Sequence, residues 1–247
     1  MRRAVVAAIA TGAAIAAGCG DDDPDALVVS AAASLRGALT ECANSEQEPR
    51  IRLQFAGSDE LAAQIRKGVR PDVYAAANTR LPDQLAREGL LERPATFATN
   101  RLVLATPPRG TVDALEDLER AGLRLAIGSE GVPIGDYTRE VIARLGARRA
   151  RRVLANVRSE EPDVKGIVGK LAQGAADAGF VYRTDAGAAG LRALPLPDRL
   201  QPEVAYAAAA VTGTDAAEEA RAFVAGLRRG RCAGALRSAG FGPPPGR

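Results

Sequence analysis

The sequence predicts an α/β protein of two lobes, each built on a mostly parallel sheet flanked by helices. Two observations lead to this fold class. Short apolar segments with β-branched residues alternate with segments of helical periodicity along most of the 247-residue chain, which is typical of parallel sheets covered by helices. Residues 107–110 (PPRG) break the chain after one strand pattern, and a later strand pattern at 204–211 returns it, so we expect two crossings between lobes.

The N-terminal residues 1–18 are typical of a targeting segment, here a lipoprotein signal peptide. Two arginines precede an uncharged, largely apolar stretch at 4–17, and small residues then lead to Cys19. Because the apolar stretch is too short to span a bilayer comfortably, we expect cleavage before Cys19, lipid attachment to this cysteine, and an acidic tether at 19–25. The alternative is an ordinary secretory signal cut near the same place, with Cys19 incidental.

The next two predicted units each contain a strand, a turn of small residues, a serine and a helix. The first has its strand at 27–29 and its serine at Ser34, and the second has its strand at 51–55 and its serine at Ser58. Backbone N–H groups at a helix start, together with the helix dipole, form a site for an anion. Open α/β sheets bind ligands at the carboxyl edge of their strands, where both serines are expected. Each serine could equally be a plain helix cap.

The remaining elements continue the alternation. We expect strands at 71–77, 101–105, 123–127, 153–157, 178–182 and 204–211, helices at 81–90, 111–121, 136–145, 163–173 and 216–227, a turn at 183–187, and a last short helix ending at 240–241. With the crossings at 101–105 and 204–211, the first lobe comprises residues 26–105 and 205–247, and the second comprises residues 106–204.

The composition excludes several classes of function. The net charge is +3, aromatic residues make up 4% of the chain, and no basic block is present, which argues against nucleic-acid binding. Histidine is absent, so the chain has no Ser-His-Asp or Cys-His device and a transition-metal cation site is improbable. A hydrolase with Ser34 or Ser58 as nucleophile would need a base, and the three lysines are not in a Ser-x-x-Lys arrangement. We therefore do not expect an enzyme.

Four motifs together carry a family resemblance. They are AAASL, FAGSDELAAQI, RLAIGSEGVPIG and GFVYRTDA. In this order and at near-matching spacing, over residues 27–241, the chain resembles the periplasmic molybdate-binding proteins of ABC transporters. The resemblance implies the two-lobed fold of the type II periplasmic binding proteins, with the ligand held in the cleft between the lobes.

The same resemblance implies five ligand-binding residues. In that family an oxyanion stripped of water is held by neutral donors, and the matching positions here are Ser34, Ser58, Ile134, Val164 and Tyr182. The serines would use hydroxyl and backbone N–H groups, Ile134 and Val164 their backbone N–H groups, and Tyr182 its hydroxyl. Such fixed dipoles replace the hydration shell of a dianion without a countercharge. No cofactor is implied, and molybdenum would be bound as molybdate rather than as a free cation.

The implied function is that of an extracytoplasmic lipoprotein, anchored to the cell membrane, that delivers molybdate to the membrane permease of an ABC importer. Tungstate would be a second ligand, the protein would be a monomer, and only its lipid anchor would contact the membrane. The nearest alternative is a binder of another oxyanion, sulfate or phosphate, on the same fold. A serine-dependent hydrolase is a remote alternative.

Two positions depart from the family pattern. Ile134 stands where a small residue is frequent, in a loop about one residue shorter than its commonest form. Asp59 follows Ser58 where a small polar residue is more usual. Because neighbouring side chains at a helix start point in different directions, we expect Ser58 to face the cleft and Asp59 to face solvent. An Asp59 in the cleft would instead repel a dianion and offer an acceptor to phosphate.

Two cysteines remain beyond Cys19. Cys42 lies on the first predicted helix and Cys232 on the last, which in the implied fold returns to the first lobe. Outside the cytoplasm, disulfides persist, so a Cys42–Cys232 bridge would tie the two ends of the lobe together. Two unpaired, buried cysteines are the alternative.

Overall fold

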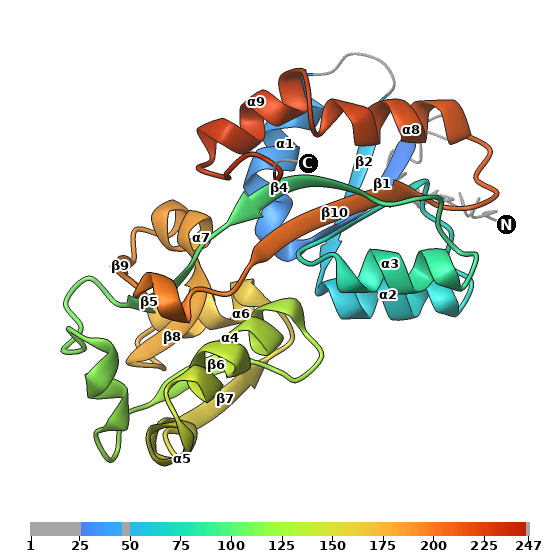
Figure 1. Cartoon of the computed structure of the whole chain (residues 1–247). Coiled ribbons are helices and arrows are strands. Elements are labelled where there is room, and N and C mark those ends of the chain that lie inside the picture. The colour runs from blue at the N-terminus through green and yellow to red at the C-terminus, as the bar shows by residue number, and fades with distance from the viewer. Residues whose placement is uncertain (1–25, 46–49, 246–247) are drawn as a thin grey trace, which may run out of the picture.

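Two lobes, each built on a five-stranded sheet, make up the structure, a computed structural model that describes residues 26–45 and 50–245 (Figure 1). The α/β, two-lobed fold class predicted from the sequence is confirmed. The predicted signal peptide at 1–18, the tether at 19–25 and the lipid-attachment residue Cys19 lie outside the described residues. Within the described part, no helix is long and apolar enough to cross a membrane.

The two sheets have the same topology. The first contains β1 (Leu27–Ala32), β2 (Ile51–Ala56), β3 (Val73–Ala76), β4 (Ala95–Asn100) and β10 (Val204–Ala210) in the order β2-β1-β3-β10-β4. The second contains β5 (Leu102–Thr106), β6 (Leu125–Gly128), β7 (Val157–Glu161), β8 (Ala178–Tyr182) and β9 (Arg192–Pro195) in the order β7-β6-β8-β5-β9.

Both sheets are mixed, with one strand running against the other four, so they are mostly parallel as predicted. In the first, β1 runs parallel to β2 and β3, whereas β10 is antiparallel to β3 and β4. In the second, β6 runs parallel to β7 and β8, whereas β5 is antiparallel to β8 and β9. The antiparallel pairs all involve β5 or β10, the strands that follow a passage from the other lobe and therefore enter their sheet from the opposite end (Figure 1).

Helices cover both faces of the first sheet. The helices are α1 (Arg36–Ser45), α2 (Ser58–Arg66), α3 (Arg80–Arg87), α4 (Pro133–Arg144), α5 (Ala147–Leu154), α6 (Val164–Ala172), α7 (Arg183–Ala188), α8 (Ala217–Gly226) and α9 (Arg231–Ser238), with short 3-10 turns η1 (Ala33–Leu35), η2 (Leu115–Glu119) and η3 (Asp198–Leu200). Helices α1, α8 and α9 lie on one face, and α2 and α3 on the other (Figure 1). Along β3, Val73 and Ala75 join the first of these cores and Tyr74 and Ala76 join the second, so both faces of this strand are buried.

The crossing between the lobes differs from the expectation. Residues 101–105 are expected to end the first lobe, but β5 pairs with β8 and β9 in the second sheet. The edge strand of the first sheet is instead β4, which the sequence analysis missed. The boundary therefore falls at Arg101, between two consecutive strands. An apolar strand pattern does not say which sheet the strand joins, which is why this boundary was wrong.

Three other segments form different elements. The helix expected at 111–121 is only the turn η2, whose entry is held by Asp117 Oδ2 accepting the N–H groups of Asp113 and Ala114 at 2.8 and 3.0 Å. The start of the strand expected at 153–157 belongs instead to α5, and β7 begins at residue 157. Val153 is the buried residue of this arginine-rich helix. The turn expected at 183–187 is the short helix α7.

A disulfide joins the first and last helices of the first lobe. Cys42 on α1 is bonded to Cys232 on α9, with the two Cα atoms 4.9 Å apart. The two helices lie side by side on the sheet (Figure 1). The bond thus links residues 190 positions apart in the sequence, and of the two alternatives left open by the sequence the structure has the bridge.

Candidate functional site

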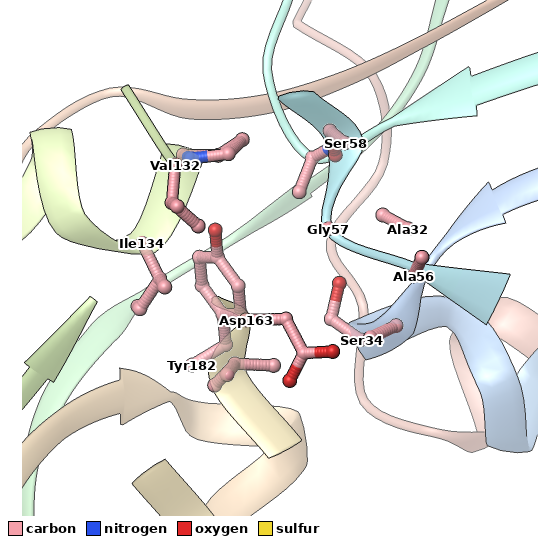
Figure 2. A pocket seen from close by; sticks show the side chains of 13 residues that line it. Ala32, Ser34, Ala56, Gly57, Ser58, Val132, Ile134, Asp163 and Tyr182 are labelled. Carbon is pink, nitrogen blue, oxygen red and sulfur yellow. The ribbon is translucent and has the colours of Figure 1, made fainter. Parts of the chain in front are cut away.

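A small pocket lies between the two lobes, and both lobes contribute to its wall (Figure 2). Its lining residues are Ala32, Ala33, Ser34, Ala56, Gly57, Ser58 and Ala77 from the first lobe and Val132, Pro133, Ile134, Asp163, Val164 and Tyr182 from the second. All five residues singled out in the sequence are among them. The pocket has a cavity volume of about 20 Å³, far below the roughly 300–1,000 Å³ of sites for drug-sized organic molecules. Its size suits a small ion.

Starts of helices surround this pocket. Ser34 lies in η1 directly before α1, and Ser58 is the first residue of α2. Helix α4 begins at Pro133, three residues before the expected start, so Ile134 belongs to its first turn. Val164 is the first residue of α6. The first N–H groups of a helix have no partner inside the helix and carry the positive end of its dipole. Among the described residues no lysine or arginine lines the pocket, so the positive partial charges at its wall are those of these backbone groups.

The Ser58 hydroxyl is held in a defined orientation. Its side chain is 2% exposed, and its Oγ accepts the N–H of Ala77 at 3.0 Å. The backbone carbonyl of Ser58 accepts the hydroxyl of Tyr74 at 2.6 Å, which fixes the start of α2 against β3. Because Oγ already accepts a hydrogen bond from the protein, the hydroxyl hydrogen remains available to donate into the pocket.

Ser34 has a comparable neighbour. It is buried, and its Oγ lies 3.1 Å from the hydroxyl of Tyr206 on β10. Either oxygen can be the donor in this pair taken alone. Tyr206 is fully buried and comes from the strand that enters the first lobe from the second, a contact between residues 172 positions apart.

Tyr182 places its hydroxyl at the pocket from the end of β8. The residue is 1% exposed, and the hydroxyl is buried with no hydrogen-bond partner among the described residues. Burial raises the pKa of this hydroxyl well above its ordinary value, so it stays protonated and acts as a neutral donor. The ring makes edge contacts with Tyr137 and Tyr206, at centroid distances of 6.5 and 5.9 Å. An orphaned buried donor aimed at a pocket indicates an acceptor in that pocket.

Ile134 and Val164 combine two roles. Both residues belong to the hydrophobic core, and both also line the pocket from the first turns of α4 and α6. Packing in the core therefore does not prevent their backbone N–H groups from acting as donors. The Ile134 side chain lies close to Gly128, where a Cβ would be 2.7 Å from Ile134 Cγ2, so the absent side chain of Gly128 makes room for the isoleucine.

Asp163, predicted from the sequence only to start a helix, also lines the pocket. Its Oδ1 accepts the N–H groups of Lys165 and Gly166 at 2.7 and 3.0 Å and so caps α6. Figure 2 shows its carboxylate at the pocket near Ser34. The cap occupies two of the first N–H groups of α6 and leaves that of Val164 for a ligand. An acidic residue directly before a helix was the available signal.

The prediction that Asp59 faces solvent is confirmed only in part, because the residue lies outside the pocket but is half-buried. Asp59 does not line the pocket, but its Oδ1 is buried without a hydrogen-bond partner among the described residues. This burial raises the pKa of the carboxyl above its ordinary value. The second lobe comes close to the chain beside this carboxylate, since a Cβ at Gly57 would lie 2.6 Å from the Pro162 carbonyl oxygen and 2.9 Å from Asp59 Oδ1. The absent side chain of Gly57 lets the lobes meet here.

One ion pair joins the lobes at the surface. Arg80 at the start of α3 donates from Nη2 to Asp136 Oδ2 at 2.8 Å and to the Gly131 carbonyl at 3.3 Å. Asp136 Oδ1 accepts the N–H of Gly131 at 2.9 Å, which braces the loop before α4. About 47% of the Arg80 side chain is exposed, so solvent weakens the pair. The described residues contain no group of three or more His, Cys, Asp or Glu side chains that could hold a metal ion.

Comparisons with known proteins agree on family and fold. Residues 27–242 match the family model described as bacterial extracellular solute-binding protein. The molybdate-binding protein ModA of Mycobacterium tuberculosis (strain ATCC 25618 / H37Rv) is 33% identical over 227 residues, covering 88% of this chain and 85% of ModA.

Two solved structures have the same fold. The Azotobacter vinelandii periplasmic molybdate-binding protein superposes with a TM-score of 0.77 at 22% identity, covering 89% of this chain and 100% of that one. The sulfate-binding protein SubI of Mycobacterium tuberculosis H37Rv gives a TM-score of 0.76 at 13% identity, covering 88% of this chain and 86% of its own. At these identities the likeness shows the two-lobed fold alone.

Proposed function

The chain belongs to the bacterial extracellular solute-binding proteins, and from that premise we propose that it captures molybdate, and tungstate with it, in the pocket between the lobes. The ligand-binding residues of this proposal are Ser34, Ser58, Ile134, Val164 and Tyr182. One observation carries it: hydroxyl groups and helix-start N–H groups meet in a small pocket that no lysine or arginine lines. Fixed donors of this kind hold a dehydrated dianion.

The hydrogen-bond pattern favours a fully ionised anion. The Ser58 hydroxyl accepts from Ala77 and so turns its hydrogen to the pocket, and the Tyr182 hydroxyl has no other acceptor among the described residues. Molybdate, tungstate and sulfate carry no proton near neutral pH. The remaining proton of phosphate would face a donor and stay unpaired, at a cost of about 1–3 kcal/mol. Among the described residues Asp163 is the one carboxylate of the pocket wall; its Oδ1 caps α6, so its Oδ2 is the acceptor that a phosphate proton would need.

The cellular part of the proposal follows from the family and the N-terminal sequence. We propose that the mature protein carries lipid on Cys19, stays outside the cytoplasm, and hands its anion to the permease of an ABC importer. The relatives that support this part include a putative ABC transporter substrate-binding lipoprotein, YvgL, of Bacillus subtilis (strain 168), 28% identical over 171 residues. Labelling with radioactive palmitate in a bacterial host tests the anchor, with Cys19→Ala as the control that should lose the label.

Titration calorimetry on the refolded, ligand-free protein tests the ligand. We expect molybdate and tungstate to bind far more tightly than sulfate, and phosphate to give no heat of binding. A thermal-unfolding panel gives a second readout, because a ligand at a thousandfold excess over Kd adds roughly 4 kcal/mol to the stability. Tight phosphate binding that is lost in Asp163→Asn would overturn the molybdate assignment and identify Asp163 as the acceptor of the phosphate proton.

A further inference from the structure

A chain of side-chain hydrogen bonds extends from the pocket serine Ser34 into the junction of the two lobes. Ser34 Oγ lies 3.1 Å from the Tyr206 hydroxyl, and the Asn100 side chain hydrogen-bonds that same hydroxyl. Asn100 is the last residue of β4, and Tyr206 lies near the start of β10, the two strands of the first sheet that adjoin the second lobe. No local sequence pattern links these three residues.

A bound oxyanion would set the direction of this chain. Asn100 Oδ1 accepts the N–H of Arg101 at 2.9 Å, and Asn100 Nδ2 donates to Thr184 Oγ1, also at 2.9 Å. In the pair of Ser34 and Tyr206 taken alone, either hydroxyl can donate. Because an oxyanion only accepts, a Ser34 hydroxyl that donates to it leaves Ser34 Oγ to accept from Tyr206, and the second N–H of the Asn100 amide can then donate to the Tyr206 oxygen.

The backbone at Tyr206 also departs from regular pairing. The register between β10 and β4 shifts between Tyr206 and Ala207, which is a β-bulge or a similar irregularity. Bulges re-aim a side chain and are typical next to functional sites. The Tyr206 ring is enclosed by edge contacts to Phe97, Tyr182 and Phe241, at centroid distances of 6.1, 5.9 and 5.3 Å. The ring is therefore fixed, and the position of its hydroxyl relative to Ser34 is fixed with it.

We propose that Tyr206 and Asn100 are positioning residues of the anion site, which hold the Ser34 hydroxyl as a hydrogen-bond donor to the bound oxyanion. The inference rests on the proposed function, because it assigns a polarity to one of the proposed donors. Neither residue lines the pocket, so each acts through Ser34. Hydrogen bonds in series also polarise one another, which strengthens the last donor of the chain.

The far end of the chain of hydrogen bonds reaches the second lobe. Thr184 lies on α7 of the second lobe, whereas Asn100, Tyr206 and Ser34 belong to the first. The bond between Asn100 and Thr184 thus joins the two lobes in the same hydrogen-bond network as Ser34.

A double-mutant cycle tests the proposal on the full mature chain. Molybdate affinity is measured by calorimetry for the parent, Tyr206→Phe, Ser34→Ala and the double variant, with thermal shifts at millimolar molybdate extending the range to weak binders. Tyr206→Phe keeps the ring contacts and removes only the hydroxyl. We expect it to weaken binding about five- to thirtyfold in the parent and less than twofold in the Ser34→Ala background.

Tyr137→Phe is the matched control. Tyr137 is also a largely buried tyrosine that contacts the Tyr182 ring edge-on, but its hydroxyl bonds the backbone of Ala205 rather than Ser34. The effect of Tyr137→Phe on molybdate affinity should be the same in the parent and in the Ser34→Ala variant. An effect of Tyr206→Phe that is equally large in both backgrounds, or absent in the parent, overturns the inference. A parent protein that binds no oxyanion overturns the proposed function itself, and this is seen before any variant is made.

Discussion

Replacing Ser58 with alanine should damage both the ligand site and the ligand-free fold. The change removes a hydroxyl donor to a desolvated anion, a loss of about 1.5–3 kcal/mol, or roughly ten- to a hundredfold in Kd. It also removes the acceptor of the Ala77 N–H, which Ser58 Oγ holds at 3.0 Å in a place where Ser58 is only 2% exposed. A buried N–H left without a partner costs about 1–3 kcal/mol. In a protein of this size that lowers Tm by roughly 2–12 °C.

The assay is thermal unfolding with and without molybdate, together with calorimetry. Ser30→Ala is the matched control, because Ser30 is equally buried in β1 but has only a 3.4 Å hydrogen bond to Gln54 and does not line the pocket. We expect the control to keep the parent affinity. A Ser58→Ala variant that binds molybdate within twofold of the parent would remove Ser58 from the site. An unchanged Tm without ligand would refute the part assigned to the Ala77 amide.

Three further predictions concern the bridge, a buried carboxylate and the lobe contact. Cys42 and Cys232 should resist thiol titration in the unfolded, unreduced protein, and reduction should cost on the order of 2–4 kcal/mol of stability. Burial raises the pKa of Asp185 to about 6 from 3.8, so the folded state binds this proton more tightly than the unfolded state does. As pH falls from 7 to 4, the free energy of unfolding of the parent should therefore rise by up to about 3 kcal/mol relative to that of Asp185→Asn, as measured by denaturant unfolding. A difference between the two proteins that does not change with pH would contradict this. Arg80→Ala breaks the exposed ion pair with Asp136 and should weaken molybdate binding less than about fivefold. In 1 M salt the variant and the parent should bind molybdate equally, which titrations at two ionic strengths will test.

The parts of the site that the sequence predicted have local signals. Ser34 and Ser58 each follow an apolar strand and precede a helical pattern, and Tyr182 ends a strand whose bounds were predicted to the residue. Strand-to-helix junctions at the edge of each sheet converge in space, and these edges of the two sheets face each other across the pocket, so the five positions meet there although they are far apart in the chain. Their role as ligands stays a prediction.

The parts that were missed depend on contacts between distant segments. Nothing near Asp59 in the sequence shows that the Pro162 carbonyl comes close to Gly57, beside the Asp59 carboxylate. The hydroxyl of Tyr206 meets Ser34 across 172 residues. The end of helix α5 was predicted as a strand because its apolar residues stand together there. The helix is instead supported by ion pairs of Arg149 and Arg152 with Glu119, which lies 33 positions before Arg152.

The placement of β10 sets the order in which the two lobes are completed during synthesis. All strands of the second sheet lie within residues 102–195, whereas the first sheet needs β10, which sits between β3 and β4. In a chain that emerges N-terminus first, the second sheet is complete while β4 still has no neighbouring strand in the first sheet. That open edge is a site for pairing with another chain until residues 204–210 arrive. A chain that ends before residue 204 therefore leaves an unpaired strand edge in the first lobe, where another chain can pair and aggregate. The disulfide between α1 and α9 cannot form before β10 is present, because Cys232 follows β10 in the sequence.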